Sequence, residues 1–174
     1  SLQCRGFNAI IRADDQRAMA PERVADYPRP PRLEPSDDHV LINVGGEVLF
    51  DGKGCQRVLE TFHPPTYYMP PTGIAKALLS PAAGRSFCEW KGVAEYFDVV
   101  TAKGRIHRAV WRYPSPTPSF QAIAGWFALY PGLMQGCWVN AEPVIPQPGG
   151  FYGGWITSAV EGPFKGDPKH PELI

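Results

Sequence analysis

The fold class follows from Val40-Leu41-Ile42-Asn43-Val44-Gly45-Gly46-Glu47-Val48-Leu49-Phe50, which predicts a β-hairpin. The runs on both sides are rich in the branched and aromatic residues that favour strands. Between them, Gly45 and Gly46 suit the positive φ angles of a two-residue hairpin turn. Strand signals of this kind recur from residue 39 onward, so the chain is predicted to be mainly β.

Two further hairpins are predicted from the same signals. One pairs residues 87–91 with 93–101 around Gly92, and the other pairs 137–139 with 143–145 around Asn140-Ala141. Single strands are expected at residues 56–62, 66–69, 106–111 and 155–160. Two short helices are expected, at 73–79 and at 117–126, where Thr117 is the N-cap and Pro118 takes the first helical position.

The 174 residues are enough for one domain with a proper core and are few for two. The 18 glycines and 20 prolines, with 44% hydrophobic residues, fit a globular chain of short strands and turns. We expect an N-terminal extension at 1–21, a single domain at 22–167 and a C-terminal tail at 168–174. The domain includes a proline-rich arm at 27–35, which either lies over the domain surface or binds a proline-recognising partner.

Charge, hydropathy and cysteine usage exclude several classes of protein. The 17 basic and 17 acidic residues are scattered, whereas a nucleic-acid binder normally carries a basic patch. No apolar run approaches the ~20 residues that span a bilayer and no secretory signal is seen, so we expect no membrane partner and a cytoplasmic location. The four cysteines form no C-x-x-C pair, so reduced thiols, no metal and no cofactor are expected.

Charged and sulfur-containing residues are concentrated at Cys88-Glu89-Trp90-Lys91-Gly92. On a strand, Glu89 and Lys91 share one face, and Cys88 and Trp90 share the other. In a functional interpretation, Glu89 is a general acid or base, Lys91 holds an anion and Cys88 is a nucleophile. In a structural interpretation, Cys88 and Trp90 are core residues, and Glu89 with Lys91 is a solvated ion pair worth under ~1 kcal/mol.

His63 is the histidine best placed to titrate near neutral pH, since it precedes two prolines and lies near Tyr67 and Tyr68. It follows Glu60 by three residues, so on an extended strand the two side chains would face opposite sides. The turn at 63–65 could rotate them together. The alternative is a histidine with a purely structural role at a turn.

Glycine, proline and aromatic residues together indicate a cleft. Residues 146–155 hold four glycines and three aromatics, which permit a close backbone approach and supply apolar faces. Trp111 and Tyr113 beside Pro114, and Tyr130-Pro131-Gly132, are stiff corners that can form cleft walls. The expected ligand-binding residues are Tyr67, Tyr68, Trp90, Trp111, Tyr113, Gly149, Gly150, Phe151 and Tyr152.

Several motifs resemble one family in their order and spacing. They are residues 27–32, 59–65, 67–68, 87–92, Trp111 with 113–114, 130–132, 146–155 and 162–166. The chain resembles the microbial family catalogued as domain of unknown function 427, over residues 22–167. The resemblance implies folded-over antiparallel sheets similar to the Mss4-like β-tent group. The paired C-x-x-C zinc knuckles of many β-tent domains are absent from this sequence, so no zinc is carried over.

The same family is also filed under a nucleotidyltransferase-like label. Such enzymes resemble one another in a Gly-Gly or Gly-Ser turn followed by an Asp-x-Asp or Asp-x-Glu metal pair. Here Gly45-Gly46 is followed by a lone Asp51, so nucleotidyl transfer is not favoured.

The leading hypothesis is a small-molecule-binding or small enzymatic domain with an aromatic-lined cleft. A small polar molecule is the expected ligand, and Glu89, Lys91 and His63 are the candidate catalytic residues. The alternative is a protein-interaction or structural module without catalysis, in which the aromatics form core or a sticky face. In that case the arm at 28–35 packs either on a partner or on a second copy of the chain in a homodimer. The reaction and the ligand do not follow from the sequence.

Overall fold

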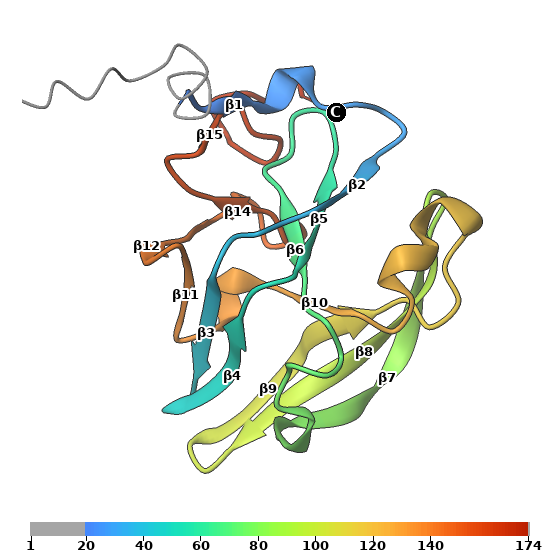
Figure 1. Ribbon diagram of the computed structural model, residues 1–174, viewed down its shortest axis with the longest axis vertical. Helices are drawn as coiled ribbons and strands as arrows, with labels where there is room; N and C mark the ends of the chain where they lie inside the picture. Colours follow the sequence, from blue (N-terminus) through green and yellow to red (C-terminus); the bar gives the residue numbers. More distant parts are fainter. Residues whose placement is uncertain (1–19, 174) are drawn as a thin grey trace, which may run out of the picture.

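The fold is described by a computed structural model over residues 20–173. The predicted N-terminal extension at 1–21 therefore lies almost entirely outside the described residues. Within residues 20–173, no helix has the length and apolar character required to traverse a lipid bilayer. The described chain is mainly β, as predicted, and consists of several antiparallel sheets and one short parallel pair (Figure 1).

One four-stranded sheet has the order β12-β11-β3-β4 and contains two of the predicted hairpins. β3 (Val40–Val44) pairs with β4 (Glu47–Gly52), and the turn between them places Gly45 and Gly46 at φ +55° and +79°. β11 (Gly136–Val139) pairs with β12 (Glu142–Pro143) around Asn140 and Ala141, whose φ angles are also positive. Both hairpins and their turns are confirmed, but the strand expected at 143–145 is β12 at Glu142–Pro143, and Ile145 belongs to another sheet.

The second four-stranded sheet has the order β10-β9-β8-β7. Its strands are β7 (Leu79–Cys88), β8 (Gly92–Thr101), β9 (Gly104–Arg112) and β10 (Phe127–Leu129). The predicted hairpin at Gly92 is present, but its first strand was placed wrongly: β7 begins at Leu79 and ends at Cys88. Pro81 and Gly84 interrupt the strand signal in the sequence, yet β7 is an edge strand with a bulge, which tolerates both residues.

Smaller sheets complete the fold. β2 (Arg32–Pro35), β5 (Gln56–Leu59) and β6 (Thr66–Tyr68) form a three-stranded sheet, so the proline-rich arm ends as an ordered edge strand. β1 (Glu22–Arg23) pairs with β15 (Val160–Glu161), and β13 (Ile145–Pro146) pairs with β14 (Trp155–Ile156). The single strand expected at 155–160 is therefore two short strands in different sheets.

Ion pairs join β1 and β2 to β5. The buried Arg57 donates to Glu22 and to Glu34, each at 2.7 Å. Burial opposes the charge on Arg57, but its hydrogen bonds to the two carboxylates raise its pKa.

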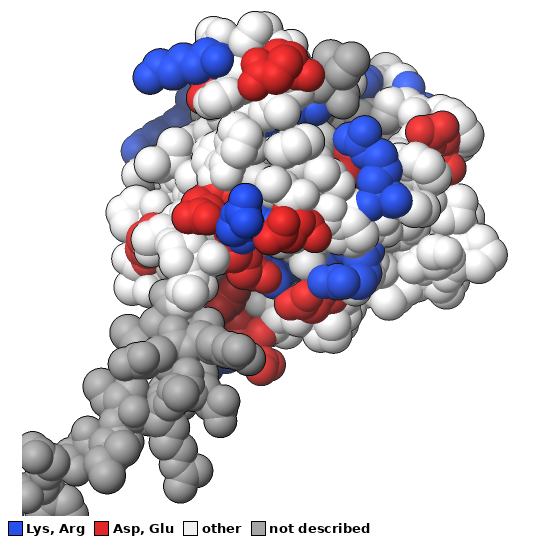
Figure 2. Space-filling view, turned by 90° about the horizontal axis from the view of Figure 1, so that it is seen from above, with Lys and Arg blue, Asp and Glu red and all other residues white. Residues whose placement is uncertain are grey.

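On the face seen in Figure 2, acidic and basic side chains are interspersed and do not form a patch of one sign.

The helical segments are 3₁₀ turns. They are η1 (Val24–Asp26), η2 (Lys76–Leu78), η3 (Pro118–Ile123) and η4 (Pro131–Leu133). The helices expected at 73–79 and 117–126 are thus shorter than predicted. Thr117 is the N-cap position of η3 but makes no side-chain capping bond, because its hydroxyl donates to the Trp90 carbonyl at 2.6 Å.

The described interior holds two main apolar clusters and a minor third one made of Val24, Tyr27, Leu59 and Val160. The larger cluster lies between the β3–β4–β11 sheet and the inner faces of β8, β9 and β10, with Val40, Ile42, Phe97 and Phe127 among its members. The smaller cluster includes Val58, Tyr68, Trp111, Tyr113 and Phe120. A backbone pair between Met69 and Phe127 joins the end of β6 to β10, so the two clusters meet along β6.

Candidate functional site

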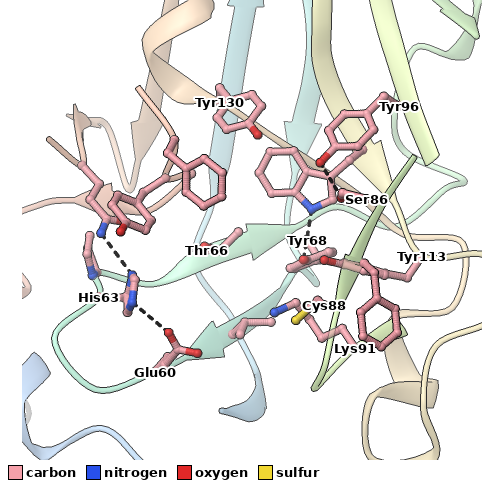
Figure 3. A pocket seen from close by; sticks show the side chains of 18 residues that line it. Glu60, His63, Thr66, Tyr68, Ser86, Cys88, Lys91, Tyr96, Tyr113 and Tyr130 are labelled. Carbon is pink, nitrogen blue, oxygen red and sulfur yellow. Dashed lines mark hydrogen bonds and ion pairs between the residues drawn. The ribbon is translucent and has the colours of Figure 1, made fainter. Parts of the chain in front are cut away.

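A cavity of about 370 Å³ opens on the side of the smaller apolar cluster. One wall comes from β5, β6 and the turn between them, another from β7, β8 and β9, and the third from residues 147–153 (Figure 3). The volume is within the range of about 300–1,000 Å³ that is typical of small-molecule sites. The lining residues are Val58, Glu60, His63, Pro64, Thr66, Tyr68, Ser86, Phe87, Cys88, Lys91, Tyr96, Trp111, Tyr113, Tyr130, Gln147, Phe151, Tyr152 and Gly153.

The turn after β5 brings Glu60 and His63 together. The His63 amide donates to the Glu60 carbonyl at 2.9 Å, and Phe62 between them has a φ of +64°. A left-handed backbone costs a bulky residue about 1–2 kcal/mol, so the rest of the fold must hold this turn in place. As a result, His63 Nε2 lies 2.8 Å from Glu60 Oε2.

Gln147 fixes which nitrogen of His63 carries the proton. Its Oε1 accepts from the Gly154 amide at 3.2 Å, and its Nε2 donates to the Lys165 carbonyl at 2.9 Å and to His63 Nδ1 at 3.1 Å. The Gly154 amide can only donate and the Lys165 carbonyl can only accept, so the side-chain amide cannot be reversed. Nδ1 is therefore an acceptor, and the ring hydrogen is on Nε2, which faces Glu60.

The carboxyl group of Glu60 is held in its charged form. Burial on its own would raise the pKa of Glu60, but the interaction with His63 and the charges of Lys91 and Arg29 bring it below its usual value. His63 occupies one carboxylate oxygen, Oε2. No hydrogen bond from residues 20–173 reaches Oε1, so this oxygen is available to a ligand.

Lys91 lies on the opposite wall, at the turn between β7 and β8. Its Nζ lies 5.8 Å from the ring centroid of Tyr113 and 5.7 Å from that of Phe120. Rings at this distance attract a cation weakly, by about 0.5–1 kcal/mol at exposed sites. In the described part of the chain, no carboxylate lies within ion-pair distance of Lys91.

Glu89 does not line the cavity, in contrast to the prediction. The prediction that Glu89 and Lys91 share a face assumed a strand through both, but β7 ends at Cys88 and residues 89–91 form a turn. The turn leaves Glu89 exposed and directs Lys91 into the cavity. Trp90 also lies outside the lining, packed against the smaller apolar cluster.

The floor of the cavity consists of buried phenol groups. Tyr68 is 1% exposed and accepts from Trp111 Nε1 at 3.2 Å. Burial raises the pKa of Tyr68 and of Tyr113, so both hydroxyls remain protonated and can donate. The prediction that these residues and Trp111 lie at one site agrees with their placement in the lining.

Tyr67 points away from the cavity, because neighbouring residues of a strand face opposite sides. It packs on Trp155, with ring centroids 4.9 Å apart, and donates to Asp38 at 3.0 Å. Tyr67 was expected among the ligand-binding residues but does not line the cavity, because β6 presents one ring to the larger core cluster and the other to the cavity.

The loop at 147–153 supplies the third wall. Tyr152 meets the His63 ring edge-on at 5.3 Å, and Phe151 lies at the mouth with 81% of its surface exposed. A Cβ on Gly153 would come within 2.5 Å of the Trp111 ring, so glycine is required where the loop packs on β9. Gly149 and Gly150 were expected in the lining but lie outside it, and they shape the loop instead.

Several lining residues were not selected from the sequence as site residues. Gln147 stands between two prolines, which restrict its backbone, and this was the only local signal for it. Tyr130 was recognised as a corner residue, and Glu60 only as the partner of His63. Ser86 and Tyr96, whose hydroxyls lie 2.7 Å apart, and Thr66 carry no local signal.

The cavity combines apolar walls with one carboxylate, one ammonium group and several neutral hydroxyls. Cys88 lies half-buried in the lining, whereas Cys55 and Cys137 are buried in the larger cluster. Within residues 20–173, no group of three or more His, Cys, Asp or Glu side chains is placed to hold a metal ion. The arrangement can orient a small polar molecule through charge and hydrogen bonds at its two ends.

A family model described as Domain of unknown function (DUF427) matches residues 32–140. The match covers more than half of the chain. It includes the two β-walls of the cavity, with Glu60, His63, Lys91 and every lining tyrosine except Tyr152, and ends before the loop at 147–153. No curated protein matches the chain significantly.

Proposed function

We propose a binding function for this chain, which belongs to the family of domain of unknown function 427. The function is the binding of a small polar molecule in the aromatic cavity between β5–β6 and β7–β9. The observation that carries this proposal is the presence of Glu60 and Lys91 in one cavity, opposite in charge and not paired with each other. Partly buried charges are costly unless a partner satisfies them, and a ligand would be such a partner.

In this proposal His63 is a positioning residue. Its Nδ1 accepts from Gln147, and its Nε2 is buried 2.8 Å from Glu60 Oε2, so neither nitrogen is open to a substrate. Its role is to hold the Glu60 carboxylate in the cavity wall. Catalysis, if the cavity performs it, would use Glu60 and Lys91, and Glu89 has no part in it.

A second candidate function is a protein-interaction surface. Phe87 and Phe151 are 76% and 81% exposed at the mouth of the cavity, and exposed aromatics are enriched at interfaces. Self-association through this face would appear as a dimer in size-exclusion chromatography with light scattering, and Phe87→Ser with Phe151→Ser would restore a monomer. The β-tent assignment also stays a proposal, supported by the antiparallel sheets around a shared core.

A thermal-shift screen tests the binding function. The wild-type protein is screened against polar metabolites, and each hit is repeated with Glu60→Gln and Lys91→Met. We expect hits whose shift falls strongly in both variants, because binding to the native state alone raises stability by RT ln(1 + [L]/Kd). Glu89→Gln and Lys103→Met are matched controls outside the cavity, and they should retain the full shift. A panel without hits, or hits equal in all four variants, would overturn the proposal.

A further inference from the structure

The two charges of the cavity lie on different walls. Glu60 follows β5, and Lys91 lies in the turn between β7 and β8 (Figure 3). The partner of Glu60 is His63, and Lys91 Nζ lies within 6 Å of the ring centroids of Tyr113 and Phe120. Among the described residues, no ion pair joins Glu60 to Lys91. A molecule that satisfies both must therefore itself carry two charged or strongly polar ends.

The Glu60 wall accepts hydrogen bonds. A carboxylate offers about four lone-pair sites, and His63 Nε2 lies 2.8 Å from one of its two oxygens, Oε2. His63 cannot turn away from Glu60, since Gln147 holds its other nitrogen. Glu60 therefore lines the cavity as a fixed, negatively charged carboxylate whose Oε1 accepts no hydrogen bond from residues 20–173, which suits an ammonium group.

The Lys91 wall and the floor beside it donate hydrogen bonds. The Tyr68 oxygen is occupied as an acceptor by Trp111 Nε1, so its own hydrogen is free to donate. Tyr113 is buried, and in residues 20–173 no hydrogen bond engages its hydroxyl. Figure 3 shows Tyr68, Tyr113, Lys91 and Cys88 close together on this side. An ammonium group with two phenol donors suits the oxygens of a carboxylate.

We propose that the cavity binds a small amino-carboxylate zwitterion, with its ammonium group on Glu60 and its carboxylate on Lys91, Tyr68 and Tyr113. This inference rests on the proposed binding function and specifies its ligand class. The remaining walls are aromatic, including Trp111 and Tyr130 with ring centroids 4.7 Å apart. These walls favour a zwitterion that also carries an apolar or aromatic side chain.

Three matched probes test the zwitterion. Isothermal titration calorimetry with the full chain uses L-phenylalanine, 3-phenylpropionate, which lacks the ammonium group, and 2-phenylethylamine, which lacks the carboxylate. We expect L-phenylalanine to bind at least about tenfold more tightly than either analogue, since one hydrogen bond to a charged group is worth roughly that factor. Equal or weaker binding of L-phenylalanine would overturn the inference.

Variants assign each end of the ligand. In Glu60→Gln, the preference for L-phenylalanine over 3-phenylpropionate should fall about tenfold, while its preference over 2-phenylethylamine persists. In Lys91→Met, the preference over 2-phenylethylamine should fall and the preference over 3-phenylpropionate should persist. Glu89→Gln should change neither preference. If each of the two cavity variants lost both preferences equally, the assignment of the ammonium group to Glu60 and of the carboxylate to Lys91 would be contradicted.

The inference and the proposed function fail differently. If none of the three probes binds but the metabolite screen yields hits that depend on Glu60 and Lys91, the zwitterion is wrong and the binding function stands. If the screen yields no such hit and no probe binds, both are wrong. If 3-phenylpropionate alone binds, the cavity is an anion site and the role given to Glu60 is wrong.

Discussion

Gln147 Nε2 lies 3.1 Å from His63 Nδ1 and donates to it, while the rest of the same amide group bonds to the backbone at Gly154 and Lys165. Gln147 is 4% exposed, so no water can easily replace these contacts. One side chain thus joins the cavity loop to the C-terminal segment and sets the tautomer of the histidine that orients Glu60.

Gln147→Leu should destabilise the protein and release His63. The variant leaves the Gly154 amide and the Lys165 carbonyl without partners, and each buried unsatisfied group costs about 1–3 kcal/mol. Urea unfolding measures this loss, and long-range ¹⁵N–¹H spectra should show the hydrogen of His63 on Nε2 in the wild type only. Gln135→Leu is the control: Gln135 accepts from the Gly46 amide at an exposed site and should cost under ~0.5 kcal/mol. Equal losses in the two variants would contradict the role of Gln147.

Glu60→Gln should flatten the acid side of the stability profile. A carboxyl group whose pKa is lowered by folding adds stability above its ordinary value of 4.5, and this stability is lost as the pH falls through the folded value. Other carboxyl groups contribute to acid unfolding, so the measurement is the difference between wild type and variant in urea unfolding from pH 7 to pH 3. The difference in unfolding free energy between the wild type and Glu60→Gln should change below pH 4.5 and stay constant above it. The control Glu89→Gln should show the same pH dependence as the wild type. A gap that is constant over the whole range would show that Glu60 is not held charged.

Gly153→Ala should disturb the contact between the loop and β9. The new methyl group would lie about 2.5 Å from the Trp111 ring, and forced contacts of this kind cost roughly 1–3 kcal/mol. Gly150→Ala is the matched control in the same loop, because nothing lies within 4 Å of a Cβ there. Thermal unfolding and Trp fluorescence compare the two variants. The packing of this loop on Trp111 is wrong if both variants behave as the wild type does.

Cys88 should be the most reactive thiol of the three that the structure describes. Burial raises the pKa of Cys55 and of Cys137 to about 12, which suppresses the thiolate in both, whereas Cys88 lines the cavity. Iodoacetamide labelling at pH 8 followed by peptide mass spectrometry measures each site separately. A ligand in the cavity should slow the labelling of Cys88, and equal rates at Cys55 and Cys88 would refute the burial difference.

The hairpins could be predicted because their turns are marked locally. Gly45-Gly46 and Asn140-Ala141 both adopt positive φ angles, and the strands on either side have clear β composition. The start of β7 could not be predicted, because its proline and glycine are tolerated only at a sheet edge, and edge position depends on the pairing of distant strands.

The cavity could be predicted only in part. Trp111, Tyr113, Phe151 and Tyr152 were expected in it and lie there, because aromatic residues beside prolines and glycines tend to form stiff walls. Glu89 was expected in the cavity but lies outside its lining, since the residue at which β7 ends decides which of the following side chains faces inward. Gln147 gains its role from three contacts across the fold, and none of them is visible in its neighbours along the chain.

The three residues of β6 place the cavity floor and the main core back to back, with Tyr68 on one side and Tyr67 on the other. A substitution at the floor should therefore also shift the core, because both are built on the same strand backbone. On β9, Trp111 and Val110 are likewise neighbours that belong to the two different clusters. Positions at the mouth, such as Phe87 and Phe151, are free of this coupling because they are exposed. Substitutions at the rim should therefore leave the core undisturbed, whereas substitutions at the floor should disturb the packing on both sides of β6.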